Sequence, residues 1–360
     1  MLGGADKMIK QLHSLRVSWT HSSWSGRLGA RISWRAVGLA AILSAGFGLN
    51  GALASPDKIA GANECGECHK KEVKAWQTTH HFSTFKELPK SKDAKEIASK
   101  MGVKRLKAES LCTSCHFTVQ EVKGKPKSIA GISCESCHAP AKDWFKVHSE
   151  FSGKKEGQES KAEIAARWKK SEEAGMIRPQ SIYTLAKNCF SCHTVPQEKL
   201  VNVGGHTAGS KFELVSWSQG EVRHNLWHNK GKSNREAGIE RKRMMFIVGR
   251  IVELEAALIG VSKATVKKDY ALKMAKRASN AKKVIKSLAG KLPEAPELKD
   301  IVAAANTAKL KLNNEADLAA AAGKVSVLGL KFASAYDGSK FGAIDKFIPG
   351  PKKFKGKASN

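Results

Sequence analysis

Four copies of one pentapeptide, Cys-x-x-Cys-His, constrain this chain of 360 residues more than any other feature, because together they use all of its eight cysteines. The copies are Cys65-Gly-Glu-Cys68-His69, Cys112-Thr-Ser-Cys115-His116, Cys134-Glu-Ser-Cys137-His138 and Cys189-Phe-Ser-Cys192-His193. Chance at this composition would give roughly 0.006 copies, and the pattern is the attachment signature of a c-type haem. Two thiols bond one edge of the porphyrin while the adjacent imidazole binds the iron. The sequence therefore predicts four covalently attached haems.

Disulfides or zinc ligands are the alternative use of so many cysteines. Zinc sites built from Cys-x-x-Cys pairs do not require a histidine directly after every second cysteine, whereas all four pairs here have one. The haem interpretation assigns thioether attachment to the eight cysteines and iron ligation to four proximal histidines, His69, His116, His138 and His193.

Residues 1–54 resemble a secretion signal. Six basic residues accompany the apolar run at residues 36–49, and Ala52-Leu53-Ala54 matches an A-x-A cleavage site. The run is shorter than the about 20 residues of a membrane span, although an uncleaved anchor is the alternative. We expect no later stretch to span a bilayer. The mature chain is predicted to begin near Ser55 and to be soluble in the periplasm, or otherwise outside the cytoplasm, where c-type haems are attached.

The chain is strongly basic, with a formal net charge of +29. The signal accounts for only six basic and one acidic side chain, and the haem propionates offset part of the rest. Such a charge favours redox protein partners with acidic docking surfaces, or contact with an anionic membrane surface. Scattered lysines that only keep the protein soluble are the simpler alternative. No nucleic-acid motif is present, so we expect no nucleic-acid partner.

The predicted fold is mainly α and has two parts after the signal. Residues 55–220 are expected to form an irregular tetrahaem cytochrome c domain with short helices, in which the porphyrins supply much of the core. Residues 221–336 contain no cysteine, and their apolar residues recur at helical spacing, as in Tyr270, Met274 and Ala278. Helices are predicted near residues 241–259, 270–288, 298–312 and 318–335, forming an antiparallel hairpin or bundle. Residues 337–360 are predicted to be a flexible basic tail.

The second axial ligand of each iron decides the chemistry, because a haem with two histidines is closed and one without a distal ligand can bind small molecules. Six histidines outside the signal and the motifs compete for four distal positions: His80, His81, His148, His206, His224 and His228. Ordinary surface histidines are the alternative for each, and three or four are expected to bind iron. His228 is the least favoured, beside His224. Met101 and Met176 are weaker candidates, and Met244 and Met274 fit core packing better.

Three local patterns resemble the tetrahaem cytochrome c-554 family, whose members take electrons from hydroxylamine oxidoreductase. Trp76 precedes His81 by five residues, as in the family's Trp-x-x-x-x-His. Gly131-Ile132-Ser133-Cys134-Glu135-Ser136-Cys137-His138-Ala139-Pro140 matches a family block, and His148 follows His138 by ten residues. The resemblance covers residues 63–196. It implies His81 and His148 as distal ligands and close-packed haem pairs between which electrons hop.

The chain departs from the family in two places. Ala139-Pro140-Ala141 replaces the family's Gly-Pro-Gly, and the match fades beyond Pro196. In the family the second haem is five-coordinate, which would leave the iron of His116 open. Here His206 and His224 could close the two remaining irons. We therefore hypothesise a pure electron carrier with His81, His148, His206 and His224 as distal ligands.

Two other functions remain open from the sequence. With one open haem, the protein would be an oxidoreductase acting on a small nitrogen or sulfur compound, with lysine or arginine providing electrostatic stabilisation. Alternatively, the helical region would be a docking module for a larger complex, although intramolecular packing explains its apolar stripes as well.

Overall fold

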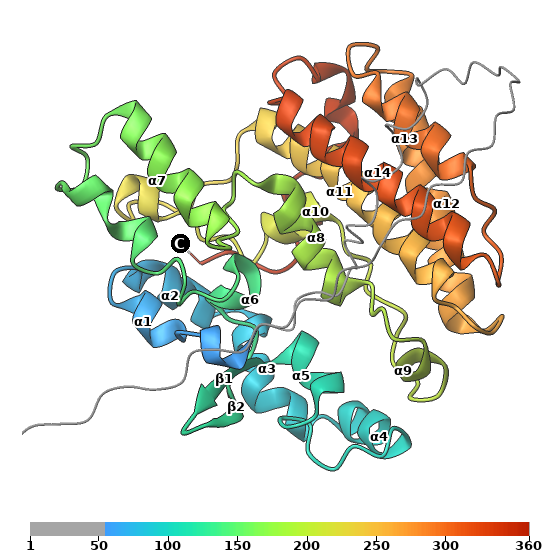
Figure 1. Cartoon of the computed structure of the whole chain (residues 1–360), viewed down its shortest axis with the longest axis horizontal. Coiled ribbons are helices and arrows are strands. Elements are labelled where there is room, and N and C mark those ends of the chain that lie inside the picture. The colour runs from blue at the N-terminus through green and yellow to red at the C-terminus, as the bar shows by residue number, and fades with distance from the viewer. Residues whose placement is uncertain (1–54, 360) are drawn as a thin grey trace, which may run out of the picture. The chain divides into compact units, whose positions relative to one another are not determined.

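The computed structural model describes residues 55–359, so the predicted signal at residues 1–54 lies outside the described residues. The described part is mainly helical, as predicted, with many short helices followed by a helical bundle (Figure 1). It falls within one compact unit. Each haem motif lies in or directly after one of the short helices, so these helices are described first.

Short helices connected by loops make up residues 55–220, because glycines, prolines and capping residues interrupt the chain often. Ser160 and Glu163 form a reciprocal capping box at the start of α7, and the Thr79 hydroxyl accepts the Phe82 N–H at the start of α3. The helices are α1 (Ala62–Gly66), α2 (Lys70–Gln77), α3 (His80–Glu87), α4 (Lys92–Lys100), α5 (Ser110–His116), α6 (Cys134–His138), α7 (Lys161–Glu173), α8 (Ile182–His193), α9 (Glu198–Asn202) and α10 (Leu214–Ser218).

A two-stranded antiparallel hairpin separates the second and third motifs. Strand β1 (Thr118–Val122) pairs with β2 (Lys125–Ala130), and the turn residues Lys123 and Gly124 both have positive φ, of 53° and 72°. Two positive φ values in a two-residue turn match the twist of the flanking strands. The sequence gives no clear strand signal here, because the turn is rich in lysine and the strands lack a long apolar alternation.

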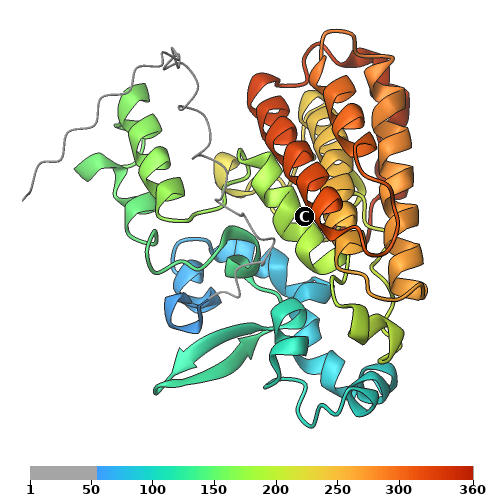
Figure 2. The same cartoon turned by 45° about the vertical axis from the view of Figure 1, so that its right-hand side comes forward.

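Four longer helices form the C-terminal bundle: α11 (Ile239–Ser262), α12 (Asp269–Ala289), α13 (Glu297–Asn306) and α14 (Glu315–Ala335). Figure 2 shows them side by side, with α11 packed against α12 and α14, and α13 against α12 and α14. The predicted apolar face of α12, including Tyr270, Met274 and Ile285, is buried. The bundle is confirmed, although α13 ends six residues before the predicted boundary.

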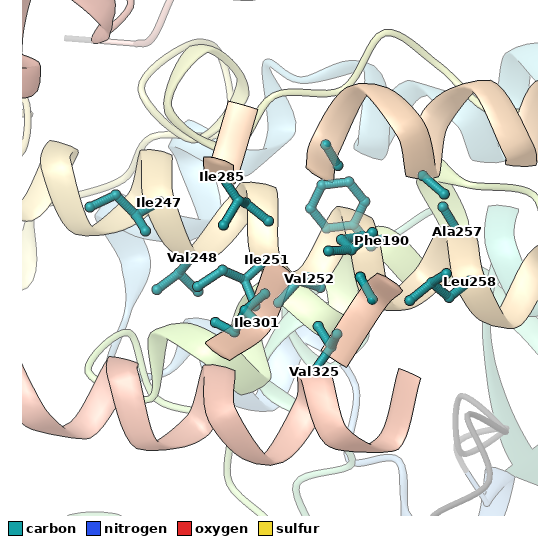
Figure 3. Close-up of a cluster of buried hydrophobic side chains, with 14 of the residues drawn as sticks. Phe190, Ile247, Val248, Ile251, Val252, Ala257, Leu258, Ile285, Ile301 and Val325 are labelled. Atoms are coloured by element: carbon teal, nitrogen blue, oxygen red, sulfur yellow. The ribbon is translucent and has the colours of Figure 1, made fainter. Parts of the chain in front are cut away.

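The core of this bundle also contains α8, the helix of the fourth haem motif. Figure 3 shows Phe190 of α8 among Ile251, Ile285 and Val325 of the bundle, all with at most 1% of their surface exposed. The Tyr183 hydroxyl, also on α8, donates to the buried Glu255 carboxylate. The proposed domain boundary at residue 220 stays a prediction, but the hydrophobic core continues across it.

The C-terminal segment differs from the predicted flexible tail at residues 337–360. Phe341 and Ile344 are buried, and Asp345 accepts two hydrogen bonds from Arg243 at 2.6 and 2.8 Å. Further along, the Lys355 N–H donates to Ser216 and the Lys355 carbonyl accepts from the Glu221 N–H. These contacts join residues far apart in sequence and produce no periodic pattern, so a prediction from the sequence misses them.

One described helix, α14, is long and apolar enough to cross a membrane, with a mean hydropathy of 1.3. The expectation that no segment after the signal meets these criteria was therefore wrong. One third of the most apolar 18-residue stretch of this helix is buried in the bundle. Leu318, Val325 and Phe332 are fully buried. A core helix of a soluble protein passes the same test.

Candidate haem-binding sites

The four motifs place their cysteines and histidines on short helical segments. The second, third and fourth motifs end α5, α6 and α8, while the first begins in α1 and continues to His69 just before α2. Residues three apart lie on the same side of a helix, so in the second, third and fourth motifs the two cysteines share one side of their helix and the histidine follows. All eight cysteines are free of disulfides, contrary to the disulfide alternative.

Each proximal histidine lies opposite one distal candidate. The ring centroids are 6.4 Å apart for His69 and His148, 6.2 Å for His116 and His206, 6.2 Å for His138 and His224, and 6.3 Å for His81 and His193. The four separations differ by only 0.2 Å although eight different chain segments contribute. The fold therefore repeats one histidine-to-histidine spacing four times.

This spacing fits an iron between the two rings. A metal–imidazole bond of about 2.0 Å and about 1.15 Å from ring nitrogen to ring centroid, taken on both sides, give about 6.3 Å between centroids. Stacked imidazoles in contact would lie closer together. Among residues 55–359 no cluster of three or more His, Cys, Asp and Glu side chains forms a metal site, whereas haem iron needs only two protein ligands because the porphyrin supplies four. The residues present thus fit c-type haems.

Backbone carbonyls orient four of the eight paired imidazoles. The Nδ1 atoms of His138, His148, His206 and His224 lie 2.9, 2.6, 2.9 and 2.7 Å from the carbonyl oxygens of Ile177, Phe145, Thr207 and Val222. A carbonyl only accepts, so Nδ1 carries the proton and Nε2 presents its lone pair. This is the usual arrangement around histidines that bind metals. His193 differs, because its Nδ1 lies 2.9 Å from the Ser210 hydroxyl.

Burial favours the neutral form of six of the paired imidazoles, and the neutral form is the one that binds iron. Desolvation, followed by the charge of a neighbouring histidine, lowers the pKa of His116 and of His193 to about 4. Desolvation is also the largest cause of the lowered pKa at His69, His81, His138 and His148. These histidines are therefore ready to act as ligands near neutral pH.

The two remaining candidates do not join a pair. His80 is largely exposed, with 82% of its side chain accessible, and bonds Glu221 at 2.7 Å. His228 is exposed. Met244 and Met274 are buried in the bundle, as predicted. The fold thus brings together the four predicted distal histidines with the four proximal ones and leaves His80 and His228 aside.

Direct contacts link the motifs to one another. Glu135 of the third motif accepts the N–H of Gly61, just before the helix that begins the first motif, at 2.7 Å. The Cys192 thiol of the fourth motif lies 3.9 Å from the Ser114 carbonyl of the second. Between the third and fourth motifs, the Asn188 side-chain amide donates to the carbonyls of Ser136 at 2.6 Å and Cys137 at 3.1 Å. The motifs are therefore neighbours in the order first, third, fourth, second.

Backbone contacts join two of the patterns that resemble the cytochrome c-554 family, the one with Trp76 and His81 and the block that begins at Gly131. The Trp76 indole N–H donates to the Ile132 carbonyl at 2.7 Å, and the Ile132 N–H donates to the His81 carbonyl at 3.0 Å. A Cβ at Gly131 would lie 2.2 Å from that same carbonyl oxygen, so glycine allows the close approach. The segment before the third motif thus holds the helix that carries His81.

Two charged residues near the motifs were not predicted to be functional from the sequence. Glu135, a spacer in the third motif, is 2% exposed and accepts three backbone N–H groups. Arg277, on α12, donates to the Ser210 carbonyl at 2.9 Å, beside His193. A charged spacer between motif cysteines was a visible signal for Glu135, but nothing local marks Arg277.

Comparisons with known proteins cover part of the haem-binding region. The family model described as "Cytochrome c554 and c-prime" matches residues 64–139, which contain the first three motifs. The resemblance to the cytochrome c-554 family is confirmed. Cytochrome c-554 of Nitrosomonas europaea is 26% identical over 149 residues, which are 39% of this chain and 60% of the relative. No solved structure matches.

The similarity to cytochrome c-554 indicates a c-type cytochrome with covalently bound haem that takes part in electron transfer. The match covers less than two thirds of the relative's length. The family model ends at residue 139, before His148, His206, His224 and the C-terminal bundle. The number of haems and their axial ligands must therefore be argued from this chain's own residues.

Proposed function

We propose that the chain is an exported tetrahaem c-type cytochrome that passes electrons between redox partners, with two histidines on every iron. The single observation that carries this proposal is the repeated spacing of 6.2 to 6.4 Å between the four histidine pairs. The bound haems would supply one-electron redox chemistry. The protein's part is to fix the ligands, to cover them and to keep the groups close to one another.

The ligand assignment follows the pairs. His148 would complete the site of the first motif, His206 that of the second, His224 that of the third and His81 that of the fourth. Aromatic side chains lie against several of these rings. The distance between ring centroids is 4.5 Å for Trp227 and His69 and 5.2 Å for Trp144 and His148. Phe212 stacks on His193 with a centroid distance of 4.5 Å. Such rings limit imidazole rotation and access of water.

The order of motif contacts supports a route for electrons. Glu135 connects the third motif to the start of the first, Asn188 connects the third and fourth, and Cys192 of the fourth motif contacts the Ser114 carbonyl of the second. Haems held at these neighbouring motifs would supply one-electron transfer between adjacent sites, which requires no proton. We propose that the first and second motifs are the two ends of this route.

The second site decides between a carrier and an enzyme. An oxidoreductase acting on a small nitrogen or sulfur compound needs one open iron. The rings of His206 and His116 have nearly the same centroid separation as the other pairs, 6.2 Å, which favours the carrier. The docking-module alternative is also disfavoured, because α8 of the fourth motif shares its core with the C-terminal helices.

We further propose periplasmic location and an acidic protein partner. The chain is basic overall, and α12 presents four exposed lysines on its outer side, Lys273, Lys276, Lys283 and Lys286. Opposite charge on a partner would accelerate encounter and make it sensitive to salt. Arg277 on the same helix is half-buried and lies beside the His193 loop, so a partner bound at these lysines would dock near the fourth site.

Low-temperature electron paramagnetic resonance of the oxidised holoprotein tests the proposed function. We expect exclusively low-spin ferric signals and no spectral change on adding cyanide or nitric oxide, because two histidines close every iron. Haem quantification should give four haems per chain. A high-spin signal that responds to nitric oxide would overturn the carrier proposal in favour of an enzyme, and fewer than four haems would overturn the tetrahaem assignment.

A further inference from the structure

We propose that Glu135 and Arg277 set the reduction potentials of the haems in opposite directions, Glu135 lowering those of the first and third sites and Arg277 raising that of the fourth. This inference rests on the proposed haem sites. It concerns how electrons are distributed among them.

Glu135 places a buried negative charge between two attachment sites. It lies between Cys134 and Cys137, and its Oε2 accepts the Gly61 N–H at 2.7 Å, at the residue that precedes α1 and the first motif. Its Oε1 accepts the N–H groups of Ala60 and Ala141, each at 2.8 Å. All three partners are donors, which fits the ionised carboxylate. The charge is thus fixed by the backbone of both the first and third sites.

Arg277 connects the C-terminal bundle to the proximal ligand of the fourth site. Its Nη2 donates to the Ser210 carbonyl at 2.9 Å, while the Ser210 hydroxyl lies 2.9 Å from His193 Nδ1 and the Ser210 N–H donates to the His193 carbonyl. The Arg277 side chain is only 12% exposed and pairs with Glu253 at 3.0 Å, and Glu253 also pairs with Arg250. The three side chains together carry one net positive charge next to this ligand, with little screening by water.

The sign of each effect follows from the change in charge on reduction. An oxidised haem iron carries one more positive charge than a reduced one, so a nearby carboxylate stabilises the oxidised form and a nearby guanidinium the reduced form. The partner of His193 acts in the same direction as Arg277. A serine hydroxyl is a weaker acceptor than the carbonyls opposite His138 and His148, so it makes this imidazole a poorer electron donor to iron.

The two charges together favour one direction of electron transfer along the proposed route. Electrons that enter at the first or third site would move toward the fourth, because Glu135 disfavours reduction at the start and Arg277 favours it further along. The bias is built into the folded chain and requires no bound effector. It also gives the C-terminal helices a role in the redox chemistry, since α12 supplies the positive charge.

Potentiometric titration of the holoprotein, followed by visible and paramagnetic resonance spectra, tests this. We expect Glu135→Gln to raise, and Arg277→Gln to lower, the midpoint potential of the affected haems. The expected change is about tenfold in the oxidised-to-reduced ratio at fixed potential, about 59 mV for one electron. Arg277→Lys keeps the charge and should recover most of the difference.

The chain offers a matched control for each change. Glu67 is the acidic spacer of the first motif, one position later in the pentapeptide than Glu135, and it is exposed, so Glu67→Gln should leave every potential unchanged. Arg250 bonds the other oxygen of Glu253 at 2.8 Å, so Arg250→Gln disturbs the same ion-pair network without removing Arg277. Equal shifts in a variant and its control would overturn the proposal.

The measurements on the Arg277 variants are sufficient to refute the proposal, even if Glu135→Gln accumulates too little holoprotein to be measured. Unmoved potentials in Arg277→Gln with four low-spin haems would overturn this inference and leave the proposed function standing. A haem count other than four, or high-spin signals in the unaltered protein, would instead overturn the proposed function. The spin state and haem count of each sample therefore separate the two failures.

Discussion

His206→Ala is expected to convert one of the four haems from low-spin to high-spin, because it removes the imidazole that lies 6.2 Å from His116. An iron without a distal ligand can bind small molecules, so the variant should bind nitric oxide or cyanide at one haem per chain. The oxidised protein should show a high-spin signal from roughly one haem in four. Paramagnetic resonance and ligand titration measure both.

His228→Ala is the control for this change. His228 is an exposed histidine in the same part of the chain, and its removal should leave all four haems low-spin. If His206→Ala also stays low-spin, His206 is not the distal ligand of the second site. Met101 is then the next candidate, because its Sδ lies 3.1 Å from the Cβ position of Gly204, just before His206.

Sequence motifs predict which histidines are candidate ligands better than they predict which two histidines lie opposite each other. The pentapeptides mark the proximal histidines, since covalent attachment dictates their spacing. His148 follows the third motif by ten residues, yet it lies opposite His69 of the first motif. His81 follows the first motif, yet it faces His193 of the fourth. Distance along the chain does not determine which side of which haem a side chain reaches, because tertiary packing decides it.

The fold shows a similar division. The periodicity of α12 was sufficient to predict its buried face, because a helix repeats its pattern every few residues. The place of α8 in the same core was not predictable, since its sequence is dominated by the fourth motif. The buried Glu135 and the docked segment around Lys355 depend on backbone contacts with distant residues. Such contacts have no signature in either partner's local sequence.

The same substitution at two glycines of α14 is expected to change stability in opposite directions. A Cβ at Gly329 would lie 2.4 Å from the Tyr183 ring and 2.8 Å from Ile251, whereas a Cβ at Gly323 meets no atom within 4 Å. Gly329→Ala should lower the free energy of unfolding by about 1–3 kcal/mol through overpacking. Gly323→Ala should raise it by about 0.5–1 kcal/mol, because alanine favours the helix.

Denaturant unfolding of the two holoprotein variants, followed by circular dichroism, measures these changes. Gly323→Ala is the matched control, since it adds the same methyl group to the same helix. Because Tyr183 lies on α8, the strain at Gly329 should also reach the fourth motif and alter the spectrum of that haem. Equal stabilisation by both substitutions would show that α14 does not pack on α8 as described. The bundle would then no longer be a support for the fourth haem site.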